Sequence, residues 1–396
     1  MNCLIETIVD KRGWVCGIAD GRKGLPVPQQ WMSYFNNRVA RALTPLVCHY
    51  DCMWLYDVEE EFDFTGYNEL QLNAMVAFNN YTGRCMTSLG RGANIAFGHG
   101  GPGEFFSRKL SSSENEMVVE FETGAKAKIQ FKPHFYHTFD LPVKTFGDLK
   151  SLNLPDPFDE NRYKSIKDNI KYLKDRGEFV MCSLNGFFSG LHYFLCDYQE
   201  VLMGLIADHK LIEGMLDKLG NWNLAVAGQL ADCGADCIAL CDDLGAKQSM
   251  LLSPDHYRKF FKKWHKQLCD NMHEKGVLVH LHSHGAISPV LNDIADCGFD
   301  FVNPFDPEEG FDIEYLLKEY SKEFVIVGGL PASFWLWDRQ KQLKNVEYLI
   351  KLGHEYGRFV LMDSGGIPEG VTKDDYDFIT SKSRQLRGIE EVDYAV

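Results

Sequence analysis

The regular alternation of short apolar segments with amphipathic segments is the feature that most limits how this chain can fold. After the LPDP sequence at residues 154–157, the alternation repeats six times. The apolar segments lack the polar alternation of a half-exposed strand, so we expect parallel strands buried on both faces, each followed by a helix. The expected strands cover residues 179–184, 237–241, 277–285, 299–303, 324–327 and 359–362.

A series of this kind closes into a barrel if the first 150 residues add one or two strands. The alternative is an open doubly wound sheet, but no glycine-rich nucleotide fingerprint follows a first strand. The sequence therefore predicts an α/β fold, a (β/α)8 TIM barrel. We expect an N-terminal helical arm or lid at residues 1–36, a single barrel domain at 37–396, and an inserted β-hairpin at about 117–138.

Charge and cysteine content restrict the partners and the compartment. The formal net charge of −15 argues against nucleic acid or an anionic membrane as the main partner. Twelve irregularly spaced cysteines do not resemble a disulfide framework. No segment resembles a signal peptide or a membrane span, so we expect a cytoplasmic protein that acts on a small molecule.

Three of the thirteen histidines fall within one expected strand, VLVHLHSHG at residues 277–285. Because side chains alternate along a strand, His280, His282 and His284 share one side. A His-x-His pair at the end of a strand is typical of a metal or catalytic site, and zinc is the metal that such a pair with a carboxylate favours. The other interpretation is that the imidazoles only form hydrogen bonds in a half-buried core.

Polar residues stand at the ends of five expected strands, where the reactive residues of an α/β barrel gather. The other interpretation is that each Asp or Asn merely caps the helix that follows it. Five polar strand ends favour a shared site. These residues are Asn185, Asp242 and Asp243, His282 and His284, Asn303 and Asp306, and Asp363 and Ser364.

We assign expected roles to these residues by their chemistry. His282 and His284 are the expected zinc ligands, with Asp243, Asp306, Glu308 and Asp363 as candidate third ligands or hydrogen-bonding partners. Asp242, Asp243 and Asp363 are candidate catalytic carboxylates, and one of the adjacent pair Asp242-Asp243 is expected to face the site. Asn185, Asn303 and Asp306 are candidate substrate-binding residues; Phe187, Phe188, His192 and Phe194 form an apolar wall or belong to the core.

Four stretches carry a resemblance to a known family: NGFFSGLHYFL, CDDLGAKQSMLLSPDHYRKFF, VLVHLHSHGAISPVLNDIADCGFDFVNPF and DSGGIPEGVTKDDY. From about Arg38 to the C-terminus the chain resembles the uroporphyrinogen decarboxylase superfamily, and most of all its corrinoid-dependent methyltransferases. The resemblance implies a TIM barrel and a zinc ion held by a His-x-Cys pair and a second cysteine. His282 matches the histidine, whereas His284 and Gly365 stand where the two cysteines are expected.

The resemblance implies an enzyme that moves a methyl group between a small methylated substrate and a corrinoid carried on a partner protein, because nothing in this chain resembles a cobalamin domain. Glycine betaine, methoxyaromatics and methylated amines are all compatible with the site. One alternative is a barrel that binds a small ligand or a tetrapyrrole without turnover. The other is a decarboxylase, although an acidic barrel mouth, with only Arg84 and Arg91 near a pocket loop, disfavours a polyanionic substrate.

Overall fold

The computed structural model describes residues 72, 87–89, 108–130, 135–364, 371 and 373–386. Its main element is a parallel sheet of seven strands in the order β1-β6-β7-β10-β11-β12-β13. All six strands expected from the sequence are present, and β1 is the seventh. The bounds are β1 (Thr87–Leu89), β6 (Val180–Asn185), β7 (Cys237–Cys241), β10 (Leu278–His282), β11 (Phe301–Phe305), β12 (Val325–Leu330) and β13 (Phe359–Asp363).

The strand order agrees with a barrel and not with a doubly wound sheet. Each strand of the parallel sheet pairs with the next strand of that sheet along the chain, and the order does not reverse anywhere among the described residues. A reversal is what creates the switch point of a doubly wound fold. The fold is therefore that of the (β/α)8 TIM barrel, to which the described residues contribute seven strands.

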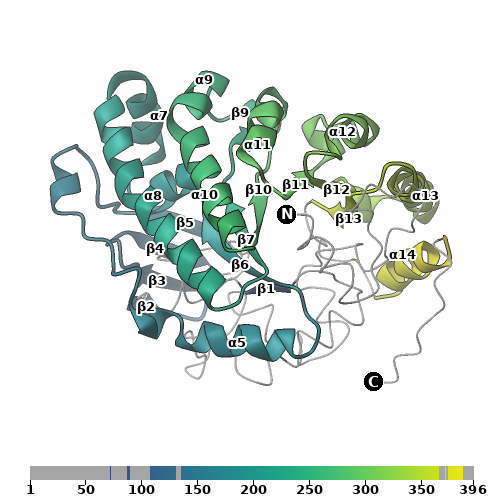
Figure 1. Cartoon of the computed structure of the whole chain (residues 1–396), viewed down its shortest axis with the longest axis horizontal. Coiled ribbons are helices and arrows are strands. Elements are labelled where there is room, and N and C mark those ends of the chain that lie inside the picture. Colours follow the sequence, from purple (N-terminus) through teal and green to yellow (C-terminus); the bar gives the residue numbers. More distant parts are fainter. Residues whose placement is uncertain are drawn as a thin grey trace.

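Helices cover the outside of the parallel strands (Figure 1). Among them α8, α10, α12 and α13 pack on β6, β10, β12 and β13, respectively. The bounds are α5 (Lys164–Lys174), α6 (Phe187–Phe194), α7 (Tyr198–Ala207), α8 (His209–Asp232), α9 (Pro254–His256), α10 (Lys262–Glu274), α11 (Leu291–Cys297), α12 (Ile313–Tyr320), α13 (Arg339–Tyr356) and α14 (Lys373–Leu386), with a π-helical segment at Tyr257–Phe261.

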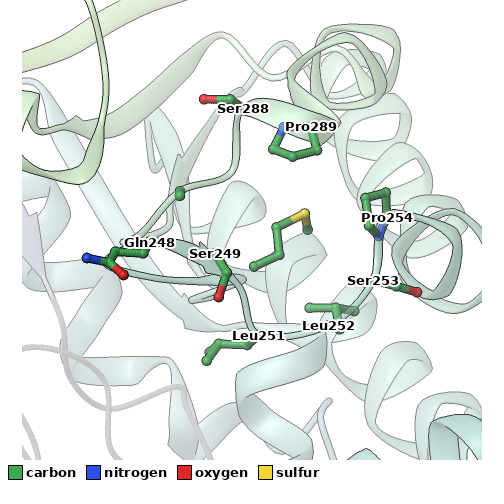
Figure 2. Close-up of a pocket in the computed structure, with 10 residues that line it drawn as sticks. Gln248, Ser249, Leu251, Leu252, Ser253, Pro254, Ser288 and Pro289 are labelled. Atoms are coloured by element: carbon green, nitrogen blue, oxygen red, sulfur yellow. The ribbon is translucent and has the colours of Figure 1, made fainter.

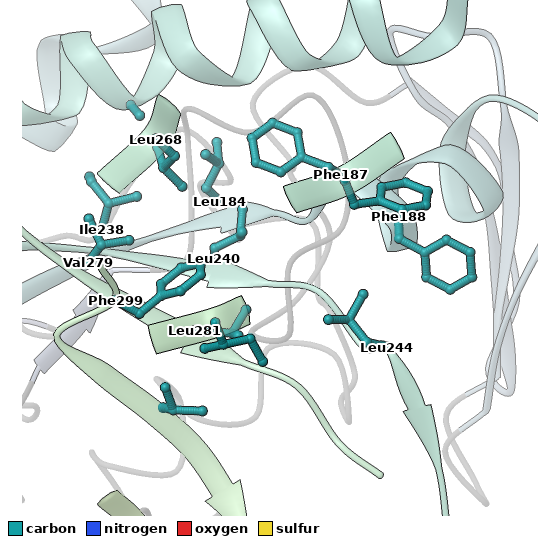
Figure 3. Close-up of a cluster of buried hydrophobic side chains, with 14 of the residues drawn as sticks. Leu184, Phe187, Phe188, Ile238, Leu240, Leu244, Leu268, Val279, Leu281 and Phe299 are labelled. Carbon is teal, nitrogen blue, oxygen red and sulfur yellow. The ribbon is translucent and has the colours of Figure 1, made fainter. Parts of the chain in front are cut away.

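The two faces of each strand have different neighbours. Ile238 and Leu240 of β7 and Val279 and Leu281 of β10 join the hydrophobic core beneath the helices, where Leu268 of α10 meets them (Figure 3). A buried leucine or valine side chain contributes about 1.5–3 kcal/mol of transfer free energy. The alternate residues, His280 and His282 among them, therefore point to the other face, toward the interior of the barrel.

A small antiparallel sheet stands beside the barrel (Figure 1). The hairpin expected at about 117–138 is present as β3 and β4, and β2 and β5 flank it. A charged contact of 2.6 Å between Arg162 and Glu122 joins this sheet to the segment before α5. The bounds are β2 (Arg108–Ser112), β3 (Glu116–Glu120), β4 (Lys126–Gln130) and β5 (Phe135–Phe139).

Three local expectations differ from the structure. The sequence predicts a loop at residues 185–190, directly after the first expected strand, but this segment is helical from Phe187 onward. The strand expected to continue to residue 285 ends at His282. β11 continues through Pro304, where its register against β12 shifts.

Several expectations lie outside the described residues. They include the arm at 1–36, the position of Gly365, and Arg84 and Arg91. Within the described part of the chain, no helix is long and apolar enough to cross a membrane.

A short hairpin pairs with the segment that directly follows β10. Strands β8 (Gly245–Ala246) and β9 (Ser249–Met250) form this hairpin, and the Ala286 backbone N–H donates to the Ala246 carbonyl over 2.9 Å. Gly285 has φ +89°, and a Cβ there would lie 2.1 Å from the carbonyl carbon of Gly245. Only glycine permits this backbone approach.

Replacing Gly285 with alanine is expected to destabilise the protein more than the same change at Gly310. Both residues have positive φ, but a Cβ at Gly310 would have no neighbour within 4 Å. The backbone conformation costs about 1–2 kcal/mol at either position, and overpacking adds about 1–3 kcal/mol at Gly285 alone. Urea unfolding of both variants measures the difference; equal losses would contradict the close approach.

Candidate functional site

Four side chains form a row at the C-terminal ends of neighbouring strands. The ladders pair Asn185 with Cys241, Cys241 with His282, and His282 with Asn303. Residues paired in a parallel ladder project to the same face of the sheet, with strands about 4.8 Å apart. This row, which we call the mouth row, therefore faces the barrel interior across four strands.

His282 is oriented from one side by Asn303. The His282 Nδ1 lies 2.9 Å from Asn303 Oδ1, which can only accept, so Nδ1 carries the proton. The other ring nitrogen, Nε2, lies 3.9 Å from Asp243 Oδ1 and carries the lone pair whenever the ring is neutral. A histidine whose second nitrogen is held by a hydrogen bond in this way has the usual arrangement of a metal ligand.

His284 lies just beyond the strand and is held by Glu309. Its Nδ1 lies 3.3 Å from Glu309 Oε1, while Glu309 Oε2 accepts the Gly285 N–H at 2.9 Å. The rings of His282 and His284 are 5.0 Å apart between centroids and nearly perpendicular, at 84°. Asp243 Oδ1 also accepts the His284 backbone N–H at 2.8 Å. Two imidazoles and two carboxylates therefore meet at this end of β10.

Glu309 was missed by the sequence analysis, which selected its neighbour Glu308. The sequence FDPEEG places both after β11, and nothing in it distinguishes them. The turn geometry decides: Asp306 accepts the Glu308 N–H at 2.7 Å, and the Glu308 carboxylate contacts Ser333 on the neighbouring loop. Glu309 is the residue that reaches His284.

The pKa of His284 is raised above its usual value of 6.5. Burial is the largest single effect and lowers this pKa, but the hydrogen bond and charge of Glu309, together with the charges of Asp243 and Asp306, outweigh it. His284 in the metal-free protein is therefore protonated more readily than in the unfolded chain. Its contribution to stability is complete below pH 6.5 and is lost as the pH rises through the raised pKa.

Asp242 lies outside the mouth row, on the helix side of β7. Its carboxylate, 0% exposed, accepts the backbone N–H groups of residues 187–189 over 2.8–3.0 Å and contacts His265 Nε2 at 2.9 Å. Tyr257 Oη lies 2.9 Å from the other nitrogen of His265. This enclosed carboxylate thus holds the first turn of α6, a helix that precedes Asp242 in the chain rather than the one that follows it. Asp243 is the member of the pair that approaches His282.

Asp306 and Asp363 are also buried, with 3% and 2% exposure. Asp306 accepts N–H groups from Glu308 and Ala332 and the hydroxyl of Ser364, so it links the ends of three strands. Asp363 Oδ2 accepts Trp335 Nε1–H at 3.1 Å. Of these two carboxylates, Asp306 acts on His284 through its charge, which raises the pKa of that ring.

The residues expected to form an apolar wall do not all lie in one environment. Phe187, Phe188 and Phe194 are core residues with no more than 1% exposure. His192 packs against Phe188 and Tyr198, and burial lowers its pKa to about 4 despite the charges of Asp242 and Asp243. Within the described residues its buried Nε2 has no hydrogen-bond partner. His192 is therefore a neutral ring close to the two aspartates.

A pocket of about 630 Å³ adjoins the loop that follows His284 (Figure 2). Its size is in the range of small-molecule sites. No charged side chain lines it, in contrast to the acidic group around His284. The lining residues are Gln248 to Pro254, Ala286, Ser288 and Pro289.

The donor atoms at the mouth are those that zinc takes in proteins: imidazole nitrogen, carboxylate oxygen and, at Cys241, sulfur. The buried Nδ2 of Asn185, in the same row, has no hydrogen-bond partner among the described residues, which suits a ligand with an acceptor atom beside it. As the side chains stand, no three His, Cys, Asp or Glu residues of the described part are close enough to hold an ion. The residue types are therefore ones that zinc takes, but their arrangement in the described part of the chain does not form a metal site.

Comparison with protein families gives one assignment. The model of the family "Uroporphyrinogen decarboxylase (URO-D)" matches residues 117–384. The chain belongs to the uroporphyrinogen decarboxylase family. This match covers all the strand ends that form the site.

Curated relatives of two kinds match parts of the chain. A methylcobamide:CoM methyltransferase of Methanosarcina barkeri is 32% identical over 118 residues, 30% of this chain and 31% of that protein. A methylcobamide:CoM methyltransferase of Methanosarcina acetivorans is 25% identical over 199 residues, 50% of this chain and 56% of that protein. A uroporphyrinogen decarboxylase of Alkalilimnicola ehrlichii is 26% identical over 152 residues, 36% of this chain and 40% of that protein. The chain thus matches between about a third and just over half the length of these relatives, all of which are enzymes.

Among solved structures, a methyltransferase from Methanosarcina mazei matches with a TM-score of 0.63. The match covers 97% of this chain and 98% of that chain at 16% identity. This match supports the barrel fold, in agreement with the order in which the strands pair.

Replacing Asp242 with alanine is expected to destabilise the fold by about 3–5 kcal/mol, because it leaves His265 and three buried N–H groups without their acceptor. Asp197 provides the control, since it caps α7 through the Gln199 N–H at 2.8 Å from an exposed position. Asp197→Ala is expected to cost about 1 kcal/mol. Chemical denaturation compares the two; a loss at Asp242 no larger than at Asp197 would contradict the network.

Replacing Glu309 with glutamine is expected to lower the pKa of His284, because burial then acts against a weaker opposing charge. Proton NMR of the imidazoles of the metal-free protein, with His284 assigned by substitution, measures the change. Glu308→Gln is the matched control and is expected to leave this pKa unchanged. The same pKa in both variants would show that Glu309 does not hold the ring.

Proposed function

We propose that this protein transfers a methyl group between a small methylated substrate and the cobalt of a corrinoid carried on a partner protein. The observation that carries the proposal is the approach of His282, His284 and Asp243 at the C-terminal end of β10, with His282 oriented by Asn303. The methylcobamide:CoM methyltransferases among the relatives support the same class of reaction.

In this proposal His282 and His284 hold a zinc ion through their Nε2 atoms, and Asp243 completes or orients the site. Bound zinc would act as a Lewis acid on the atom of the substrate that carries or receives the methyl group. Asn303 and Glu309 keep the Nδ1 atoms of the two rings occupied, so that each ring can present Nε2. The pocket beside Ala286 offers an uncharged surface on which the rest of a small substrate can lie.

A corrinoid protein would deliver its cobalt to the open end of the barrel, where these residues lie. An acidic mouth favours partners and substrates that are neutral or cationic over polyanions. The second candidate function, decarboxylation, is supported by the Alkalilimnicola relative. Decarboxylation requires cationic groups for a carboxylated substrate, whereas the ion-pair partners described for His282 and His284 are the carboxylates of Asp243 and Glu309.

Elemental analysis tests the metal part of the proposal. The unchanged protein, purified with zinc present, is expected to contain about one zinc per chain. His282→Ala combined with His284→Ala is expected to lose it, whereas His256→Ala, on α9, retains it. An unchanged protein without zinc would contradict the zinc mechanism and favour a ligand-binding or acid–base role for the histidines.

Methyl transfer itself is tested with purified corrinoid protein and a panel of methyl donors, by following the absorbance of the methylated cobalt. Loss of transfer in the His282→Ala, His284→Ala double variant but not in His256→Ala is expected. Carbon dioxide release from a carboxylated substrate, without any methyl transfer, would favour the decarboxylase instead.

A further inference from the structure

A second row of side chains lies one step deeper in the barrel than the mouth row. The ladders pair Ser183 with Ala239, Ala239 with His280, and His280 with Phe301. These residues come two positions before the members of the mouth row, so they project to the same inner face, about 7 Å further from the mouth. At these two levels the inner face of β7 carries short side chains, Ala239 and Cys241, with longer side chains of β10 beside them.

The inner face of β7 retains accessible surface that its outer face lacks. Ala239 is 5% exposed and Cys241 is 8% exposed, whereas Ile238 and Leu240, on the helix side of the same strand, are 0% exposed. Because these inner side chains are small and keep some accessible surface, they border a space that a water molecule can enter. This space lies between β6 and β10, which are two strand spacings, or about 10 Å, apart.

Asn185 stands on the β6 side of this space with an unused donor. It is 6% exposed, and its Nδ2 has no hydrogen-bond partner among the described residues. The backbone is fixed at this point, since Asn223 Nδ2 donates to the Asn185 carbonyl over 2.8 Å and Asn223 is itself 1% exposed. A buried N–H group of this kind is unfavourable, because it has lost water and gained no acceptor. Asn185 therefore presents a fixed donor to whatever enters the space.

His280 stands on the β10 side of the space. It is 2% exposed, and neither of its ring nitrogens forms a hydrogen bond within the described part of the chain. Phe301 packs against the ring from the β11 side, with centroids 5.9 Å apart. Asn303 lies near, but its Oδ1 contacts His282 Nδ1 and its Nδ2 donates to Met362 Sδ. Burial lowers the pKa of His280 to about 4, and the opposite effect of Asn303 is smaller, so the ring is neutral.

We propose that the inner face of β7 binds an uncharged oxygen atom of the substrate, which accepts a hydrogen bond from Asn185 Nδ2 and has the neutral ring of His280 on its other side. This inference rests on the proposed function and deepens it, because it names the substrate class. The class is a methyl ether and not a methylated amine.

The chemistry of the two flanking side chains makes this choice. An ether oxygen has lone pairs for the Asn185 N–H group and carries no charge. A protonated or quaternary amine has no lone pair, so it would leave Asn185 without an acceptor. A charged group of either sign also needs a partner of opposite charge when it is buried, and neither a primary amide nor a neutral imidazole supplies one.

Calorimetric titration of the unchanged protein with methoxybenzene and with ethylbenzene tests the proposal without any variant and without a corrinoid protein. Ethylbenzene has the same shape with a CH2 group in place of the oxygen, and it is the more apolar of the two. Methoxybenzene is expected to bind about fivefold more tightly, because it alone accepts the hydrogen bond. Phenyltrimethylammonium is expected to bind more weakly than methoxybenzene. Equal affinities for the two uncharged probes, or no binding of methoxybenzene, overturn the proposal and leave a water molecule as the partner of Asn185.

Asn185→Leu provides the second readout, with Asn221→Leu at an exposed position of α8 as the matched control. Leucine has a similar volume and no donor, so the preference for methoxybenzene over ethylbenzene is expected to disappear at position 185 and to remain in the control. The readout is a ratio of two affinities, which a general loosening of the fold does not change in favour of one probe. A preference that persists in Asn185→Leu overturns the inference.

The corrinoid assay separates this inference from the proposed function. Methyl transfer from methoxybenzene is expected. Transfer from a methylated amine, with none from methoxybenzene, would leave the proposed function standing and overturn the substrate class.

Discussion

The parallel register of β7, β10 and β11 is the constraint on which the rest of the site depends. The strands are paired residue by residue, and side chains alternate between the two faces of the sheet. The residues that pack under the helices therefore fix which residues face the barrel interior. Val279 and Leu281 are drawn under the helices by hydrophobic burial. His280 and His282 consequently point inward, although burying an imidazole is itself unfavourable.

Hydrogen bonds between neighbouring strands and loops offset the unfavourable free energy of burying these polar groups. Asn303 bonds His282 across one ladder, and Glu309 bonds both His284 and the Gly285 backbone. His280, deeper in the barrel, is kept neutral because burial lowers its pKa to about 4. His280 is thus a deeply buried neutral histidine, whereas His282 and His284 lie at the mouth, near the carboxylates of Asp243 and Glu309.

Much of the barrel could be predicted from local pattern. Six apolar segments were expected as strands, and all six are present, because continuous apolar runs of this length have few other stable arrangements. Their order along the sheet could also be expected, since a strand that follows its helix returns beside the preceding strand. The helix at Phe187 was not predicted, because the carboxylate that caps it comes from Asp242, more than fifty residues away in the chain. The spacing of His282 and His284 predicted a histidine pair at the end of this strand. Because β10 ends at His282, His284 lies in the following loop and not on the strand.

The sequence by itself determined the number of strands that the parallel sheet has after residue 157, the apolar periodicity that buries them, and the presence of two histidines and several carboxylates at their ends. Those features depend on side-chain type and on a period of two, which are local properties. Only the tertiary structure decided which carboxylates meet the histidines. Asp242, Asp306 and Asp363 bond to backbone groups, His265, Ser364 or Trp335, whereas Asp243 and Glu309 reach the imidazoles. A carboxylate bonds to whichever donors the loops bring within about 3 Å of it, and contacts between distant segments do not appear in the local pattern.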